Sequence, residues 1–186
     1  MALKATIFKA NLQLADMDRG VYADHALTLA RHPSETDERM MVRLVAFALH
    51  VPPTDDAGTL EFAKGLWDVD EPELWHRDLT GRIVHWIDVG QPDERRLMKA
   101  SGRADRVTVV SHGQSTPLWW NGIASKVSRA RNLAVWQFPA EPARELAALA
   151  RRGMQLQVNV QDGSVSVRSD DGAVEFEPVL LSGPRD

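Results

Sequence analysis

The chain has 186 residues and no cysteine, which excludes disulfide bonds and thiolate metal sites. Its composition, 44% hydrophobic and 26% charged, is ordinary for a globular protein and suits one domain over residues 1–186. The formal net charge of -4 argues against a surface generally coated by nucleic acid, although it leaves room for a local basic patch.

The N-terminal stretch predicts a β-strand and no targeting signal. Polar and apolar side chains alternate between Ala5 and Leu14, as in a strand with one buried face. This stretch contains no continuous apolar segment, and no apolar run in the chain approaches the roughly 20 residues of a membrane span. We therefore expect a soluble cytoplasmic protein without a membrane partner, and a monomer as its state.

A helix is predicted between Ser34 and Pro52. Ser34 suits the N-cap, apolar residues then recur at helical spacing, and a proline pair ends the helix. Glu38 falls inside the apolar stripe, whereas Arg39 and Arg43 fall on the opposite side. An inward carboxylate must be paired, hydrogen-bonded or close to a metal. Glu38 is therefore a candidate site residue, with the alternative that it reaches water at the helix end.

A β-hairpin is predicted from Glu73 to Asp88. A two-residue turn at Thr80-Gly81 places Glu73 across from Asp88, and Trp75 across from Trp86, on one face of the hairpin. Side chains directly opposite each other have Cβ atoms about 5 Å apart. Two carboxylates at that separation repel unless a cation or a shared proton lies between them. The pair suggests a functional site, and the alternatives are a solvated strand end or another register.

The rest of the chain divides into shorter elements. In chain order they are a strand at 59–67, a helix at 92–102 with Pro92 as its first residue, strands at 106–111 and 133–138, helices at 118–131 and 142–152, and alternating strands at 156–160, 165–167 and 174–177. Residues after Leu181 are expected to form a frayed tail.

The helix predicted at 118–131 holds the most basic part of the chain. Its cations Lys126 and Arg129 form a candidate phosphate-facing patch. The alternative is a solvated helix end, where the helix dipole favours cations.

Several longer stretches resemble the bacterial YaeQ family, and this resemblance covers essentially the whole chain. They are MALKATIFKA, TLARHPSETDERMMVRL, DEPELW and IDVGQPDERRLMKA. The order of elements, with Pro72-Glu73 opening one strand and Asp88-Val89-Gly90 ending the next, also resembles the PD-(D/E)XK superfamily. The resemblance implies an α/β fold: a restriction-endonuclease-like mixed β-sheet flanked by helices, with additional C-terminal antiparallel strands.

The resemblance implies a nuclease-like metal site that acts on nucleic acid. Glu73 and Asp88 would bind Mg²⁺ or Mn²⁺ with the Val89 carbonyl as a third ligand, and Glu38 would orient a metal-bound water for phosphodiester hydrolysis. The chain departs from the nuclease triplet at its third position, where Gly90 replaces the usual lysine. Without that lysine, a cation must come from elsewhere, or the site does not cleave.

The helix after Asp88 offers two candidates for the missing cation. Lys99 is its only lysine, and Arg95 lies one turn nearer to Asp88 on roughly the same face. We expect Lys99, or failing it Arg95, to point into the cleft between Glu73 and Asp88, unless both merely pair with neighbouring acids. The alternative function is a non-catalytic module that binds nucleic acid or a protein on a nuclease-like scaffold.

Overall fold

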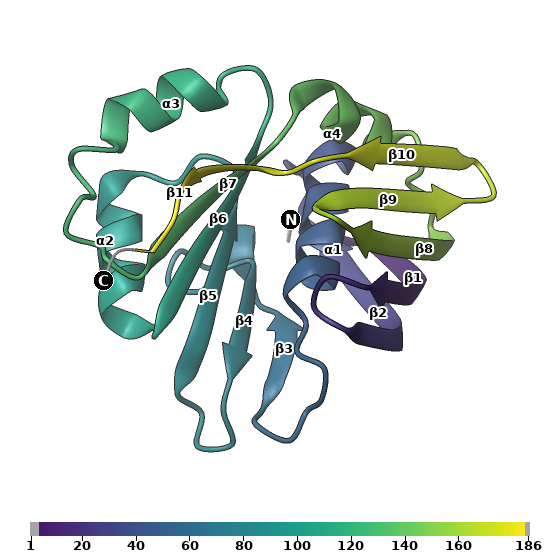
Figure 1. Cartoon of the computed structure of the whole chain (residues 1–186), viewed down its shortest axis with the longest axis horizontal. Helices are drawn as coiled ribbons and strands as arrows, with labels where there is room; N and C mark the ends of the chain where they lie inside the picture. The colour runs from purple at the N-terminus through teal and green to yellow at the C-terminus, as the bar shows by residue number, and fades with distance from the viewer. Residues whose placement is uncertain (1–3, 185–186) are drawn as a thin grey trace.

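The computed structural model describes residues 4–184, which form an α/β fold with two mixed β-sheets and four α-helices (Figure 1). The strands are β1 (Thr6–Asp16), β2 (Val21–Arg31), β3 (Thr59–Phe62), β4 (Leu74–Arg77), β5 (Ile83–Val89), β6 (Arg106–His112), β7 (Leu133–Phe138), β8 (Gly153–Gln161), β9 (Ser164–Ser169), β10 (Gly172–Phe176) and β11 (Val179–Ser182). The helices are α1 (Asp37–His50), the short 3₁₀ helix η1 (Gly65–Trp67), α2 (Glu94–Arg103), α3 (Thr116–Ile123) and α4 (Ala140–Ala147). Within residues 4–184, none of these helices is long and apolar enough to cross a membrane.

The two sheets divide the chain between its middle and its ends. The six-stranded sheet has the order β11-β7-β6-β5-β4-β3, with β5, β6 and β7 parallel. The five-stranded sheet has the order β10-β9-β8-β1-β2, so the C-terminal strands lie beside the N-terminal hairpin. The predicted antiparallel C-terminal strands are confirmed as β8, β9 and β10. Strand β11, which forms one edge of the six-stranded sheet, was not predicted from the sequence.

Helix α1 lies between the two sheets (Figure 1). Every residue from Met40 to Ala48 is buried, and side chains from both sheets pack with them in one hydrophobic core. The burial of α1 therefore extends well beyond the predicted apolar stripe. Arg43, expected on the side opposite that stripe, is only 4% exposed.

A second hydrophobic core lies on the outer face of the six-stranded sheet, beneath α2 and α3. Trp86 of β5, Val109 of β6 and Val135 of β7 pack there against Leu97 of α2. Because α1 and α2 cover opposite faces of the sheet, a strand end can meet charged side chains from either helix.

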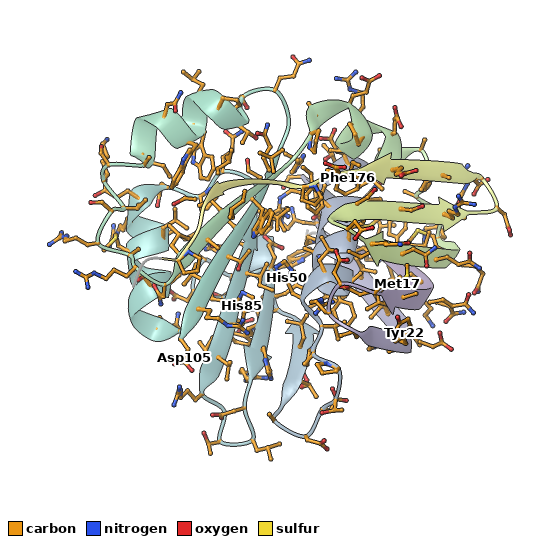
Figure 2. All side chains as sticks on the ribbon, in the orientation of Figure 1. Met17, Tyr22, His50, His85, Asp105 and Phe176 are labelled. Carbon is orange, nitrogen blue, oxygen red and sulfur yellow. The ribbon has the colours of Figure 1, made fainter. Side chains whose placement is uncertain are left out.

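His50 of α1 and His85 of β5 lie next to each other in the interior, with ring centroids 5.4 Å apart (Figure 2). Burial lowers the pKa of His85 to about 2, so its ring is neutral and shares a 2.7 Å hydrogen bond with the Thr108 hydroxyl. His85 is therefore a polar core residue, and His50 packs against it from a partly buried position.

Several element boundaries differ from those predicted. Helix α2 begins at Glu94, after the N-cap Asp93, two residues later than the start expected at Pro92. The strand expected at 59–67 ends at Phe62 and continues as η1, and the helix expected at 118–131 ends at Ile123. Local capping and turn-forming hydrogen bonds set these limits, and a hydrophobic pattern does not encode them.

The N-cap of α1 is Thr36, whereas the sequence suggested Ser34. The Thr36 hydroxyl accepts a hydrogen bond from the Arg39 N–H, while the Ser34 hydroxyl lies 2.7 Å from His32 Nδ1. Thr36→Ala should lower the free energy of unfolding by about 1 kcal/mol, and Ser34→Ala should change it by less than about 0.5 kcal/mol. Urea unfolding of both variants checks this, and a larger loss for Ser34→Ala would contradict it.

Candidate functional site

The hairpin has the predicted register near the two acidic residues. Trp75 pairs with Trp86 and Leu74 pairs with Ile87, and the Glu73 N–H donates to the Ile87 carbonyl. Glu73 therefore lies immediately before β4, beside the end of β5 that carries Asp88. The predicted Thr80-Gly81 turn is wrong.

The hairpin loop runs from Asp78 to Arg82, with a register shift before it. The Asp78 carboxylate accepts hydrogen bonds from the N–H groups of Thr80 and Arg82. This side-chain bonding stabilises a loop longer than the predicted two-residue turn.

Glu73 is part of a buried network of two glutamates and two arginines. Arg39 donates from Nη2 to Glu73 Oε1 (2.5 Å) and from Nη1 to Glu35 Oε1 (2.8 Å). Arg43 donates to both oxygens of Glu35, and its Nε lies 3.8 Å from Glu73 Oε2. Burial alone would lower the pKa of Arg39, but the carboxylates of Glu73 and Glu35 raise it above its ordinary value. The four charges compensate one another.

Gly65 of η1 packs directly against the Glu73 carboxylate. Its φ of +53° is a left-handed conformation, and a Cβ at this position would lie 2.2 Å from Glu73 Oε2. Both this backbone conformation and this lack of space require glycine at position 65. The absence of a side chain lets the η1 backbone pack directly against the Glu73 carboxylate.

Asp88 has a separate arginine partner. It is 2% exposed and accepts a bidentate pair of hydrogen bonds from Arg96 of α2, with both distances 2.8 Å. Arg96 also donates to the carbonyls of Val69 and Glu71. The hydrogen bond to Asp88, which outweighs the effect of burial, raises the pKa of Arg96. This arginine therefore joins α2, β5 and the loop before β4.

Both acid–arginine pairs line one cleft of about 340 Å³. Arg39, Glu73, Asp88 and Arg96 supply its charged groups, and Gly65, Leu66, Val69 and residues 89–92 supply the rest of its wall. We call this the acid–arginine cleft. It lies at the carboxyl end of β5, where polar groups from both helices meet.

The predicted metal ligands Glu73, Asp88 and Val89 are close to this cleft but are already bonded. Arg39 Nη2 donates to the Val89 carbonyl (3.1 Å) as well as to Glu73, and Arg96 takes both oxygens of Asp88. Within residues 4–184, no three histidine, aspartate or glutamate side chains converge to hold a metal ion. The oxygens of Glu73, Asp88 and Val89 do not fit a metal ion as long as the guanidiniums of Arg39 and Arg96 remain bonded to them.

Glu38 lies outside the acid–arginine cleft. Its Oε1 is 2.7 Å from Nδ1 of His112, at the end of β6, and its side chain is 27% exposed. The structure thus pairs Glu38 with a histidine on the neighbouring strand and does not bring it to Glu73 and Asp88. The glutamate that joins Glu73 through Arg39 and Arg43 is Glu35.

The cation beside Asp88 is Arg96. The prediction that Lys99 or Arg95 points into the cleft between Glu73 and Asp88 is wrong. The Lys99 ammonium pairs with Asp70, and both side chains are largely exposed. Arg95 is exposed and does not line the cleft. Lys99 is thus solvated and paired with an acid of the loop before β4, not with the acids at the start of its own helix.

Lys126 and Arg129 also lie away from the acid–arginine cleft. Both are exposed on the turns that follow α3. These turns lead to Asn132, whose amide donates to the carbonyls of Ser101 and Ala104 near the start of β6. The two cations are therefore nearer to the amino ends of the parallel strands, whereas the cleft lies at the carboxyl end of β5.

The sequence contains a signal for the arginines that the motif search missed. Glu35, Arg39 and Arg43 follow one another at intervals of four residues, with Glu35 just before the helix and the two arginines one turn apart within it. Asp93, three residues before Arg96, is a favourable N-cap residue, and its carboxylate accepts the Arg96 N–H. This cap places Arg96 in the first turn of α2.

The chain is similar throughout its length to known proteins. A family model described as YaeQ protein matches residues 1–178. The chain is 42% identical over 185 residues to the uncharacterized protein YaeQ of Escherichia coli (strain K12) and 43% identical to that of Salmonella typhi, with 99% of each chain covered. Among solved structures, the YaeQ protein from Xanthomonas axonopodis pv. citri has a TM-score of 0.89 at 49% identity, over 97% of this chain and 99% of that one. The YaeQ protein from Pseudomonas syringae has a TM-score of 0.89 at 38% identity, over 98% of both chains.

The two helix-start glutamates should differ in their effect on stability. Glu35→Gln leaves buried Arg43 without its anionic partner and should lower the free energy of unfolding by about 3 kcal/mol. Glu38→Gln breaks only a partly exposed contact and should cost less than about 1 kcal/mol. Chemical denaturation of both variants measures the difference, and equal losses would show that the buried network is not held by Glu35.

Proposed function

The chain belongs to the YaeQ family, and from its cleft we propose that it binds phosphodiester groups of nucleic acid on a nuclease-like, PD-(D/E)XK-type scaffold without metal-dependent hydrolysis. The observation that carries this proposal is the position of Arg39. One nitrogen of its guanidinium donates to both Glu73 Oε1 and the Val89 carbonyl, which are two of the three oxygens expected to hold an ion. A protein cation therefore stands at the position predicted for the metal.

Arg39 has hydrogen-bonding capacity left for a phosphate. A guanidinium has five N–H donors in a planar fork that matches phosphate oxygens. The bonds to Glu35, Glu73 and Val89 leave the Nε donor among those still available. A Cβ at Gly90 would be 3.9 Å from Arg39 Nε, so the missing side chain leaves room for close approach beside that donor.

The carboxylates act in this proposal as counter-ions that hold the arginines in place. Glu73 and Glu35 fix Arg39, and Asp88 fixes Arg96, so neither guanidinium must be ordered when a phosphate arrives. Because the acid–arginine pairs are close to neutral, a monoanionic phosphodiester meets no net repulsion in the cleft.

Metal-dependent phosphodiester hydrolysis is the second candidate, favoured because Glu73 and Asp88 line the same cleft. Glu73 and Asp88 would hold Mg²⁺ or Mn²⁺, which supplies an activated water when bound. Both oxygens of Asp88 are bonded to Arg96, so the guanidiniums would first have to leave the carboxylates. Removing a charge partner in a buried site is costly, which places this candidate second.

Nucleic-acid binding tests the first candidate. Fluorescence anisotropy with a labelled oligonucleotide at low salt should show salt-dependent binding. Arg39→Lys keeps the charge but loses the fork, and should weaken binding by about tenfold. The matched control is Arg95→Lys, an exposed arginine outside the cleft, which should leave binding unchanged. Equal affinity of wild type and Arg39→Lys would contradict the proposal, and no binding at low salt would indicate a protein partner instead.

Manganese titration separates the two candidates. If Arg39 excludes the ion, wild-type protein should bind Mn²⁺ weakly, and Arg39→Gln should bind it at least about tenfold more tightly. Adding Glu73→Gln to that variant should remove the gain. Calorimetry measures the affinities, and thermal melting confirms that each variant is folded. Tight Mn²⁺ binding by wild type together with Mn²⁺-dependent cleavage would establish the second candidate and overturn the first.

A further inference from the structure

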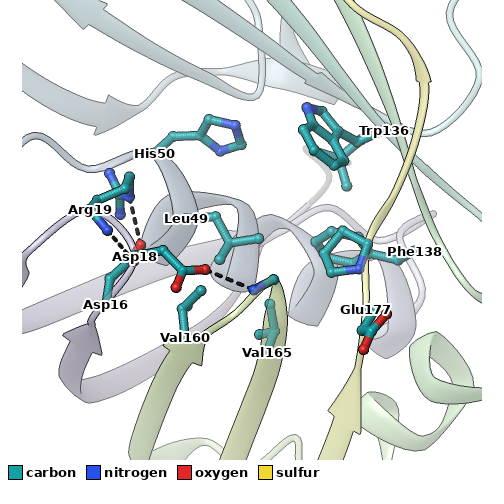
Figure 3. A pocket seen from close by; sticks show the side chains of 13 residues that line it. Asp16, Asp18, Arg19, Leu49, His50, Trp136, Phe138, Val160, Val165 and Glu177 are labelled. Carbon is teal, nitrogen blue, oxygen red and sulfur yellow. Dashed lines mark hydrogen bonds and ion pairs between the residues drawn. The ribbon is translucent and has the colours of Figure 1, made fainter.

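A second cavity lies at the other end of α1, lined by residues from strands of both sheets (Figure 3). His50, which lines it, is eleven residues beyond Arg39, or about 16 Å along the helix axis. Its volume is about 410 Å³, within the range of small-molecule sites. The cavity is separate from the acid–arginine cleft and shares no lining residue with it.

The walls of this cavity are mainly apolar and come from both sheets. Phe138 and Trp136 of β7 form one side, and Val160 and Val165 of β8 and β9 form another, with Leu49 of α1 between them (Figure 3). Trp136 is only partly buried, so an aromatic surface remains available. Such walls favour a flat apolar group.

His50 contributes a hydrogen-bond acceptor to this wall. Its Nδ1 lies 2.7 Å from the Ala46 carbonyl, which can only accept, so Nδ1 carries the proton. Burial lowers the pKa of His50 to about 4, and the ring is neutral at pH 7. Nε2 therefore carries no proton, and no donor among residues 4–184 is bonded to it.

The polar rim is acidic. Asp16 is neutralised by Arg19, whose guanidinium also donates to the last carbonyls of α1. The Asp18 carboxylate accepts hydrogen bonds from the N–H groups of Asp162 and Gly163 and has no ion pair among residues 4–184. Glu177 is exposed and has no ion pair within the described residues. The rim thus repels anions and attracts cations.

We propose that this cavity binds a small organic cation: an aromatic amine whose ring carries an N–H donor. The ring lies against the apolar wall, its N–H donates to His50 Nε2, and the ammonium lies at the rim near Glu177. Trp136 adds a cation–π contact, because an ammonium is attracted to the face of an indole.

Three probes with one ring system test the charge and the hydrogen bond. Tryptamine carries the ammonium, indole-3-acetate carries a carboxylate on the same ring, and 1-methyltryptamine lacks the ring N–H. In NMR titrations we expect tryptamine to shift the His50 and Trp136 signals and to bind about tenfold more tightly than indole-3-acetate. 1-Methyltryptamine should bind about threefold to fivefold more weakly than tryptamine, because one hydrogen bond is lost.

Two variants locate the cation. Glu177→Gln should reduce tryptamine affinity by about threefold to fivefold, as expected for a partly exposed charge pair, and leave indole-3-acetate unaffected or improved. The matched control is Glu175→Gln, two residues earlier on β10 and outside the cavity lining, which should change nothing. Equal binding of tryptamine and indole-3-acetate, no binding of tryptamine, or equal effects of the two variants would overturn the proposal.

Discussion

The pairing of buried charges on α1 is the constraint on which the cleft depends. A helix that lies between two sheets has no free solvent face, so an arginine on it must find an anion inside the protein. Arg43 meets that need with Glu35, and Arg39 with Glu35 and Glu73. These bonds connect the start of α1 to the start of β4. The same contacts place the Arg39 guanidinium beside the end of β5.

This pairing also decides what the two acids in the cleft can do. Two carboxylates at adjacent strand ends need positive charge nearby, and either a metal ion or a guanidinium can supply it. Here α1 and α2 each supply an arginine, one for Glu73 and one for Asp88. An entering ion must compete with hydrogen bonds that already satisfy the carboxylates and the Val89 carbonyl. An entering phosphate instead adds bonds to a guanidinium that is already oriented.

The sequence predicted strands β3 to β7 of the six-stranded sheet, because alternation and runs of apolar residues carry that information. The pairing of Trp75 with Trp86 is as predicted although the turn is not, because the register shift in the hairpin offsets the longer loop. Prediction failed where burial on two sides changes the meaning of a helical pattern. Glu38 was singled out because it falls within the apolar stripe of the helical pattern, whereas Glu35 precedes the helix and reaches Arg39 and Arg43 from there. Lys99 was preferred over Arg96 because the nuclease motif calls for a lysine, whereas the contact to Asp88 depends on where α2 begins. Short patterns do not encode which sheet receives the last strand, so β11 was missed.

The two ends of α1 have opposite chemistry, and the helix itself contributes to this. Its amino end favours nearby anions, and there Glu35 and Glu73 hold Arg39 in the acid–arginine cleft. Its carboxyl end favours cations, and there Arg19 donates to the carbonyls of Ala48 and Val51. Once those carbonyls are satisfied, the remaining acids at that end are free to attract a cation from outside. One buried helix thus separates a cleft lined by paired guanidiniums from a cavity rimmed by carboxylates.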